Sequence, residues 1–168
     1  MIAPLQALPP RKTLQRESLT AFTFFTVGYE QSDPQTFLKR LRLHQITLIV
    51  DVRQMPLSRK RGFSKNQLRE LLVEEGIDYL HLKTLGAPKE IRDRLRQNGS
   101  WYEYVRGYEK VLAERTNDIE TLNNLAREYR ICLLCFERNP EECHRSLVAQ
   151  KMQILENSFN LKVEHIRY

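Results

Sequence analysis

Residues that could carry out chemistry stand directly after apolar segments of this chain. The main candidates are Asp51, Arg53, Glu137, Cys143, His144 and Arg145. Carboxylates and imidazoles transfer protons, a thiol or a carboxylate can attack a substrate, and a guanidinium holds a carboxylate or a phosphate. Together these residue types predict a polar site that binds an anion and moves protons.

The two carboxylates and Arg53 each have a functional and a structural interpretation. Asp51 ends an apolar segment, where it could act as a general base, accept a sugar hydroxyl or pair with a nearby arginine. Glu137 could be a base or a nucleophile, and its structural alternative is a salt bridge with Arg53 or Arg145. Arg53 could equally bind a ligand anion or stay paired with a carboxylate. The residue types leave these alternatives open.

Cys143 and His144 lie near the predicted start of a long helix. The helix N-terminus, His144 and Arg145 could lower the pKa of the Cys143 thiol and create a reactive thiolate, whereas the two preceding glutamates oppose this shift. Packing of the thiol and orienting hydrogen bonds from the imidazole are the alternatives. Arg145 opposes the helix dipole at this position, which favours its pairing with Asp51, Glu137 or a bound anion.

Two further loops carry candidate ligand-binding residues. Gly28 and Tyr29 follow the first apolar segment of the chain. A basic run further along consists of Arg59, Lys60 and Arg61, with Ser58 directly before it. This run could clamp a phosphate or contact nucleic acid, and a solvated surface loop is its alternative. Tyr29 and Phe63 could stack on a base or belong to the core.

Three cysteines, Cys132, Cys135 and Cys143, stand in a window of 12 residues. An odd number of cysteines does not suit a disulfide framework and predicts a reducing, cytoplasmic location. Cys132 and Cys135 lie three apart on a predicted strand and would point to opposite faces, so they should not share a metal ion. Cys135, Cys143 and His144 could still meet as zinc ligands, but buried apolar thiols are the default. We therefore predict no metal and no other cofactor.

The elements that must position these residues alternate between strand and helix. The predicted strands are 22–27, 46–52, 77–82, 130–136 and 161–166, and the predicted helices are 34–43, 65–75, 89–96, 101–114, 118–129 and 141–157. Capping residues are expected at Asp33, Ser64, Ser100 and Asn117. The alternation predicts a three-layer α/β fold with a mainly parallel, Rossmann-like sheet of about five strands. Ligands bind beyond the carboxyl ends of such strands, so the loops after the first, second and fourth strands should meet there.

Length and charge place limits on the partners. The chain has 168 residues, a net charge of +6 and 29% charged residues. We expect a flexible basic arm over residues 1–20 and a single domain over residues 21–168. The positive charge favours an anionic small molecule or nucleic acid as partner, and an ordinary solvated basic surface explains it equally well. No apolar run approaches the roughly 20 residues that span a bilayer, so no membrane contact is expected.

The chain resembles the DUF488 family, a domain of unknown function. The resemblance rests chiefly on Asp51-Val52-Arg53, Cys135-Phe136-Glu137 and Cys143-His144-Arg145 in that order, and it extends over residues 22–168. It implies an α/β fold and a shared polar site, and it brings no substrate. Leu85-Gly86-Ala87 departs from the family's Leu-Gly-Gly, and Phe136 stands where the family has a small residue.

The leading hypothesis is an enzyme that acts on a nucleotide, nucleoside or nucleic-acid group. Arg53 and Arg145 would hold an anion, and Asp51 and Glu137 would transfer protons or attack. A non-catalytic nucleic-acid-binding protein that uses the basic loop and arm is an alternative. A zinc-stabilised domain and a buried ion-pair network that fixes the loops are the other two.

Overall fold

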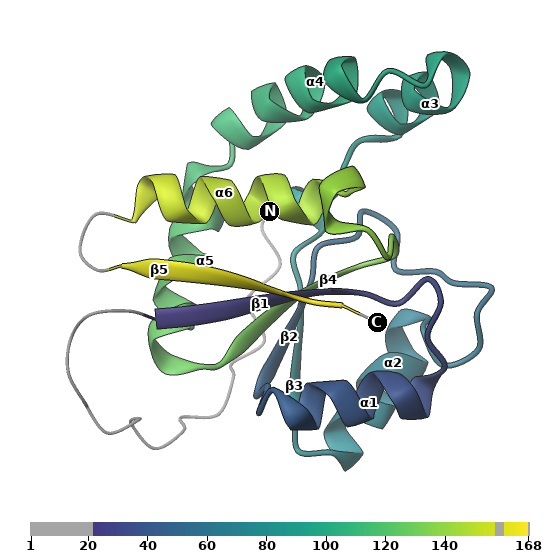
Figure 1. Cartoon of the computed structure of the whole chain (residues 1–168), viewed down its shortest axis with the longest axis vertical. Coiled ribbons are helices and arrows are strands. Elements are labelled where there is room, and N and C mark those ends of the chain that lie inside the picture. Colours follow the sequence, from purple (N-terminus) through teal and green to yellow (C-terminus); the bar gives the residue numbers. More distant parts are fainter. Residues whose placement is uncertain (1–21, 157–159, 168) are drawn as a thin grey trace, which may run out of the picture.

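The computed structural model describes residues 22–156 and 160–167, and the predicted arm over residues 1–20 lies outside this part of the chain. A five-stranded sheet forms the centre of the fold (Figure 1). Its strands are β1 (Phe22–Gly28), β2 (Leu48–Asp51), β3 (Asp78–His81), β4 (Ile131–Cys135) and β5 (Leu161–Ile166). They follow the order β3-β2-β4-β1-β5, and every neighbouring pair is parallel. The five predicted strands and the α/β fold class are confirmed.

Helices cover both faces of the sheet and complete the predicted three layers. The helices are α1 (Pro34–Leu43), α2 (Lys65–Glu74), α3 (Lys89–Asn98), α4 (Trp101–Ala113), α5 (Thr116–Glu128) and α6 (His144–Leu155), with short 3-10 helices η1 (Lys83–Leu85) and η2 (Pro140–Glu142). Figure 1 shows α1 and α2 on one side of the sheet and α4, α5 and α6 on the other. Helix α3 packs against α4 and buries none of its own residues fully. Within the described ranges, no helix has both the length and the apolar character needed to cross a bilayer.

The central strands are buried on both faces, which explains their continuous apolar character. Residues of one strand alternate between two separate cores. Val50 packs with the helices α4, α5 and α6, whereas Ile49 packs with α1 and α2. The same alternation places Leu133 in the first core and Cys132 in the second. Cys135, two residues beyond Leu133, therefore lies on the α6 face, as the period of a strand requires.

The chain leaves the sheet in opposite directions after the neighbouring strands β2 and β4. From β2 it passes over one face through α2 to β3, and from β4 it passes over the other face through α6 to β5. Adjacent strands whose connections diverge in this way leave a crevice beyond their carboxyl ends. The neighbours β2 and β4 form this switch point.

The predicted helix over residues 141–157 is interrupted near its start. Residues Pro140–Glu142 form η2, and α6 begins only at His144. Cys143 between them is extended, with φ −136° and ψ 137°, and it occupies the N-cap position of α6. This break turns the Cys143 and His144 side chains back toward the end of β4, which a continuous helix would not do.

Helix caps follow the sequence predictions in part. The Asp33 carboxylate and the Ser100 hydroxyl accept backbone N–H bonds at the starts of α1 and α4. Asn117 does not cap α5, because that helix already begins one residue before it. The Ser64 hydroxyl makes no cap bond to α2, because it bonds the backbone of Ser58 instead. Ser64 thereby ties the start of α2 to the loop that follows β2.

Candidate functional site

Three strand-end loops meet at one edge of the sheet. The strands β2, β4 and β1 are neighbours, and their registers pair Asp51 with Leu134 and Gly28 with Cys135. The residues that follow these strands are therefore side by side, as the parallel arrangement predicts. The backbone N–H of Glu30 donates to the carbonyl of Phe136 at 2.9 Å, which links the loops after β1 and β4 directly.

Asp51 and Arg53 form a buried ion pair at the end of β2. The Arg53 guanidinium donates from Nε to Oδ1 of Asp51 at 2.8 Å and from Nη2 to Oδ2 at 2.5 Å. The carboxylate also accepts from the Arg53 backbone N–H at 3.1 Å and from the Tyr79 hydroxyl at 2.6 Å. Asp51 is 0% exposed, so its oxygens are committed to these donors. The predicted structural interpretation of Asp51, pairing with an arginine, is the one observed.

The other side of Arg53 faces the loops after β1 and β2. Its Nη1 donates to the Tyr29 hydroxyl at 2.8 Å and to the Phe63 carbonyl at 2.9 Å. Burial lowers the pKa of Arg53, but the adjacent Asp51 carboxylate outweighs this effect and raises the pKa above its ordinary value. Arg53 is thus a fixed cation that organises three segments. Its ordering depends on Asp51.

Cys135, Glu137, Cys143 and His144 form a second cluster, at the end of β4. The Cys135 thiol donates to Oε2 of Glu137 at 3.0 Å, and the Cys143 thiol donates to the same oxygen at 3.1 Å. The Nδ1 atom of His144 lies 3.6 Å from the Cys135 sulfur. The opposite ring nitrogen, Nε2, lies 2.9 Å from the carbonyl oxygen of Val52. The cluster therefore joins β2, β4 and the start of α6.

Burial and hydrogen bonds together determine the protonation of this cluster. Burial raises the pKa of the Cys135 and Cys143 thiols above their ordinary value. Burial also opposes ionisation of Glu137, but the two thiol hydrogen bonds outweigh it and lower the pKa of that carboxyl. Burial lowers the pKa of His144, whereas its contacts with Cys143 and the Val52 carbonyl raise it to a net value above the usual one. The hypothesis of a low-pKa Cys143 thiol is wrong, because desolvation exceeds any effect of the helix terminus.

Arg145 forms hydrogen bonds with the backbone of the loop between β4 and α6. Its guanidinium donates to the carbonyls of Glu137 at 2.6 Å and Arg138 at 3.1 Å, and its Nε donates to the Thr26 hydroxyl at 3.2 Å. The side chain is 0% exposed. The Arg145 guanidinium thus bonds to backbone carbonyls and a hydroxyl and not to the carboxylates of Asp51 or Glu137.

Gly28 permits the close contact between β1 and the loop after β4. A Cβ atom on residue 28 would stand 1.7 Å from the carbonyl oxygen of Glu137. Only glycine fits at this distance, since real Cβ atoms do not come closer than about 3 Å to another heavy atom. Gly28 is therefore a determinant of where Glu137 lies.

A cleft of about 580 Å³ opens above these strand ends. It is lined by Tyr29, Glu30, Arg53, Gln54, Met55, Leu57, Ser58, Arg59, Lys60, Ala87, Arg92, Arg96, Tyr104, Cys135, Phe136, Glu137 and His144. The basic members are Arg53, Arg59, Lys60, Arg92 and Arg96, and the acidic members are Glu30 and Glu137. Asp51 pairs with Arg53 and Asp93 pairs with Arg96, and Arg59, Lys60 and Arg92 are further cations of the lining.

Some of the predicted site residues line the cleft, and the others do not. Those that line it are Tyr29, Arg53, Ser58, Arg59, Lys60, Glu137 and His144, and those that do not are Gly28, Asp51, Arg61, Cys143 and Arg145. The second group, apart from the exposed Arg61, lies directly beneath the first and holds it in place. Tyr29 and Phe63 are buried and stack on each other, with ring centroids 4.4 Å apart, so the Phe63 ring belongs to the core.

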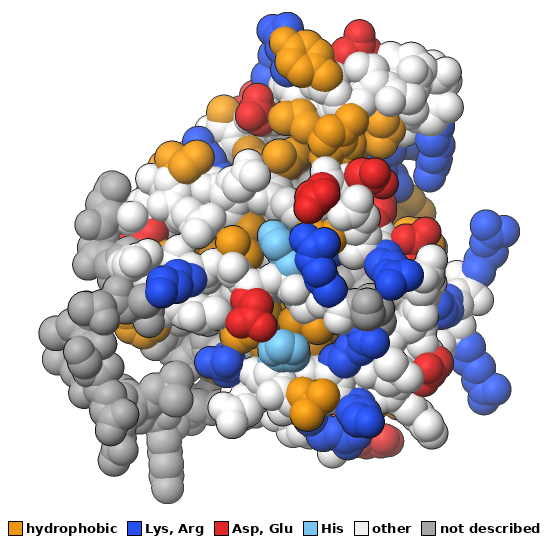
Figure 2. All heavy atoms as spheres, in the orientation of Figure 1, with side chains coloured by type: hydrophobic (Ala, Val, Ile, Leu, Met, Phe, Trp, Pro, Cys, Tyr) orange, Lys and Arg blue, Asp and Glu red, His pale blue; other side chains and the backbone are white. Residues whose placement is uncertain are grey.

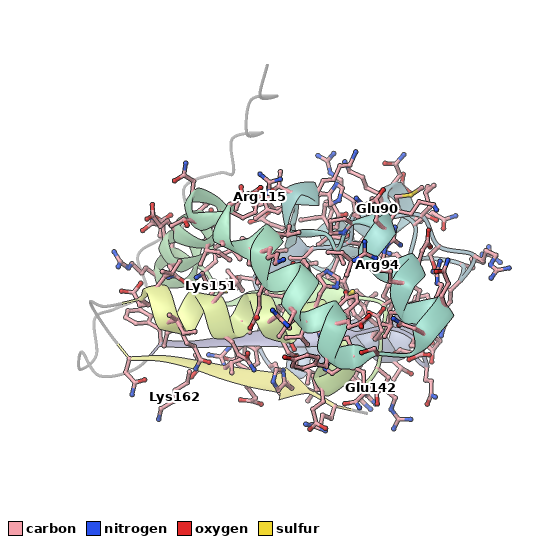
Figure 3. All side chains as sticks on the ribbon, turned by 90° about the horizontal axis from the view of Figure 1, so that it is seen from above. Glu90, Arg94, Arg115, Glu142, Lys151 and Lys162 are labelled. Carbon is pink, nitrogen blue, oxygen red and sulfur yellow. The ribbon has the colours of Figure 1, made fainter. Side chains whose placement is uncertain are left out.

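Several lining residues were not singled out from the sequence. Arg92 and Arg96 belong to α3, and Figure 3 shows Glu90 and Arg94 of this helix toward the same end of the molecule as Glu142. The high charge of the α3 segment was the one sequence feature that could have pointed to Arg92 and Arg96. Phe136, exposed to 42%, meets the Tyr29 ring edge to face at 5.4 Å. A large aromatic residue at the end of a predicted strand was the sequence feature that could have pointed to Phe136.

Comparison with known proteins gives one match. The family model described as "Domain of unknown function DUF488" matches residues 33–152, which include both clusters. No curated protein and no solved structure matches the chain. The match agrees with the resemblance that the Asp-Val-Arg, Cys-x-Glu and Cys-His-Arg segments indicate.

Proposed function

The chain belongs to the DUF488 family, a domain of unknown function, and we propose from its own site that it is an enzyme acting on a phosphate-bearing nucleotide or nucleic-acid group. One observation carries this proposal. Cationic side chains surround a cleft whose floor holds a carboxylate, a thiol and an imidazole from Glu137, Cys135 and His144. The first group suits a phosphate, and the second suits proton transfer or attack.

The phosphate would bind at the α3 side of the cleft. Arg92 donates from Nη2 to the Gln54 side chain at 2.9 Å, while its buried Nε has no hydrogen-bond partner among the described residues. An unsatisfied buried donor is costly, and a ligand oxygen would satisfy it. Arg96 lies one turn further along α3, and Arg59 faces the cleft from the loop after β2. Arginine forks of this kind fit phosphate oxygens.

The base of the ligand would lie against Phe136. This ring is 42% exposed, lines the cleft and is fixed from behind by the buried Tyr29. An exposed aromatic face beside cations is the arrangement on which single-stranded nucleic acids and nucleotides stack. Phe136 takes the role that the sequence suggested for Tyr29 and Phe63.

Glu137 is the group that we assign to the reaction. Its carboxylate reaches the cleft, and Gly28 and Arg145 hold its backbone in place. Asp51 lacks this access and is a positioning residue for Arg53. His144 lies beside Glu137 in the lining of the cleft, and a hydrogen bond to the Val52 carbonyl orients its imidazole ring.

The test of catalysis is product formation. The full chain is incubated with mononucleotides and short oligonucleotides, and mass spectrometry follows any loss of base, phosphate or amino group. We expect turnover by wild type, loss of turnover in Glu137→Gln, and retained binding in that variant, because glutamine preserves the shape. Wild-type rates in Glu137→Gln would contradict the assignment. The control is Glu142→Gln, an exposed glutamate five residues away that does not line the cleft.

A non-catalytic nucleic-acid-binding protein is the second candidate. Figure 2 shows Lys and Arg side chains that project from the edge of the molecule where Figure 1 places the loop between β2 and α2. Arg59 and Arg61 of this loop are exposed, whereas the Lys60 ammonium donates to the carbonyls of Tyr29 and Glu30. This function predicts salt-dependent oligonucleotide binding without turnover. It also predicts that an Arg59→Gln/Arg61→Gln variant binds oligonucleotides more weakly than wild type, although this variant keeps Arg92 and Arg96.

A further inference from the structure

Four potential metal ligands converge at the floor of the cleft. One ligand atom from each of Cys135, Glu137, Cys143 and His144 lies within 4.8 Å of all the others. The measured separations are 3.0 Å and 3.1 Å from the Glu137 oxygen to the two sulfurs, and 3.6 Å from the Cys135 sulfur to Nδ1 of His144. Ligands of a tetrahedral zinc ion lie about 3.3–3.8 Å apart, given metal–ligand bonds of about 2.0–2.3 Å. The four atoms need only small shifts to surround an ion.

The hydrogen bond of His144 prepares its other nitrogen for a metal. A backbone carbonyl can only accept, so the Nε2 atom that lies 2.9 Å from the Val52 oxygen carries a proton. In the neutral ring Nδ1 then has a free lone pair, and Nδ1 is the atom that faces the Cys135 sulfur. Metal-binding histidines are commonly oriented by this type of outer hydrogen bond.

The surroundings of the two thiols also separate this cluster from ordinary buried cysteines. A structural cysteine packs its sulfur among apolar groups, as the position of Cys132 in the α1/α2 core illustrates. Cys135 and Cys143 instead direct both sulfurs at one carboxylate oxygen. The extended backbone of Cys143 brings its sulfur from α6 to β4, and sequence spacing alone does not produce this convergence.

We propose that Cys135, Cys143 and His144 bind a Zn²⁺ ion at the cleft floor, with Glu137 at the fourth position. Glu137 lines the cleft and is only partly buried, whereas the other three ligands are buried, so the fourth position is the one most open to a ligand. Three fixed ligands and one exchangeable position are typical of catalytic rather than structural zinc. Binding converts both thiols to thiolates and releases their protons to solvent.

This site goes beyond the proposed function and does not require it. A zinc ion with an exchangeable position polarises an oxygen ligand or supplies a bound hydroxide. With two cysteines and one histidine as ligands, a nearby glutamate that leaves the metal is free to transfer protons. The metal and the acid–base role of Glu137 are therefore compatible.

The experiment measures metal binding by the full chain without any nucleotide. Reduced wild-type protein is stripped with a chelator and titrated with Zn²⁺ against a chromophoric zinc indicator, and Co²⁺ is added separately for its absorption spectrum. We expect stoichiometric Zn²⁺, and a Co²⁺ spectrum with the sulfur charge-transfer bands of two thiolates and the intense visible bands of tetrahedral geometry. Cys143→Ala should lose stoichiometric Zn²⁺ and half of the charge-transfer intensity, whereas Cys132→Ala should retain both.

Two results would overturn the site. One is wild-type protein that binds no stoichiometric Zn²⁺, and the other is equal loss in Cys132→Ala and Cys143→Ala. Should Cys143→Ala fail to fold, the wild-type Co²⁺ spectrum decides alone, because a spectrum without sulfur bands places the metal elsewhere. The nucleotide-binding screen uses variants of Arg92 and Arg96, which lie outside the metal cluster. The zinc site and the nucleotide-binding part of the proposed function can therefore each fail separately.

Discussion

The carbonyl oxygen of Glu137 lies 1.7 Å from the position that a Cβ atom on residue 28 would occupy, so Gly28 and Glu137 fit together only while residue 28 is glycine. This contact joins the end of β1 to the loop after β4. The Arg145 guanidinium donates to the same carbonyl oxygen at 2.6 Å. The position of the Glu137 carboxylate in the cleft is therefore determined by its backbone.

Gly28→Ala is expected to destabilise the protein by at least about 1–3 kcal/mol, because an inserted methyl group forces the backbone apart. The measurement is the free energy of unfolding in urea. The matched control is Gly107→Ala in α4, where the new Cβ would meet Ile91 at an ordinary 3.5 Å. That control should gain about 0.5–1 kcal/mol from the lower backbone entropy of the unfolded chain. Equal stability of the two variants would refute the steric account.

Asp51→Asn should cost about 3–5 kcal/mol, because it leaves the Arg53 charge buried without its partner. Chemical denaturation measures this loss. Replacing both residues, as Asp51→Asn with Arg53→Met, should recover part of it, since no buried charge then remains. Glu75→Gln, which breaks the exposed pair with Arg42, should change stability by less than about 1 kcal/mol. A similarly small effect at Asp51 would show that the buried pair does not organise the loops.

Phe136→Ala should weaken the binding of adenosine monophosphate but not that of ribose 5-phosphate, because only the first has a base to stack. The expected loss is about 1–3 kcal/mol, or roughly 5- to 150-fold in Kd. Titration calorimetry with both ligands measures it. Tyr102→Ala is the control, because Tyr102 is 69% exposed on α4 and does not line the cleft. Equal losses for both ligands would mean that Phe136 supports the cleft without stacking.

His165 should make stability depend on pH. Arg145 donates to the Thr26 hydroxyl, whose oxygen lies within hydrogen-bond distance, 2.8 Å, of Nδ1 of His165. Burial lowers the pKa of His165, as do the charges of Arg145 and Arg167, while Glu141 opposes them. The unfolded chain protonates this ring near pH 6.5 and the folded chain only at lower pH.

The free energy of unfolding should therefore fall as the pH falls below about 6.5, because the unfolded state binds more protons in this window. Urea denaturation at closely spaced pH values measures the slope. In His165→Gln the slope should be smaller, because the amide does not titrate. An unchanged slope in that variant would assign the pH dependence to other groups.

The alternation of strands and helices was sufficient to predict the sheet and the edge where the polar loops meet. Buried β-branched runs such as residues 46–52 have few alternatives to a central parallel strand. Given parallel strands, Asp51, Glu137 and Tyr29 had to emerge at the same edge. The meeting of these residues at one edge of the sheet was therefore predictable from local patterns.

The partners of each charge were not predictable, because they depend on strand order and on backbone geometry. Arg145 donates to two carbonyls of the loop before its own helix and to Thr26 of β1, and Thr26 comes within reach because β1 lies beside β4. Arg92 reaches the cleft through the long excursion between β3 and β4, whose path the sequence does not specify. The burial that raises the pKa of Cys143 likewise follows from packing over α6, not from its neighbours in sequence.

The most direct test of the central claim is a thermal-shift screen of wild type against nucleotides and short oligonucleotides, with the Arg92→Gln/Arg96→Gln variant beside it. A ligand that binds only the folded state raises Tm by mass action. Arg94→Gln, on the same helix but outside the cleft lining, is the control (Figure 3). We predict that phosphate-bearing ligands raise Tm for wild type and Arg94→Gln and not for the double variant. Equal shifts in all three proteins, or no shift in wild type, would contradict a phosphate-binding cleft.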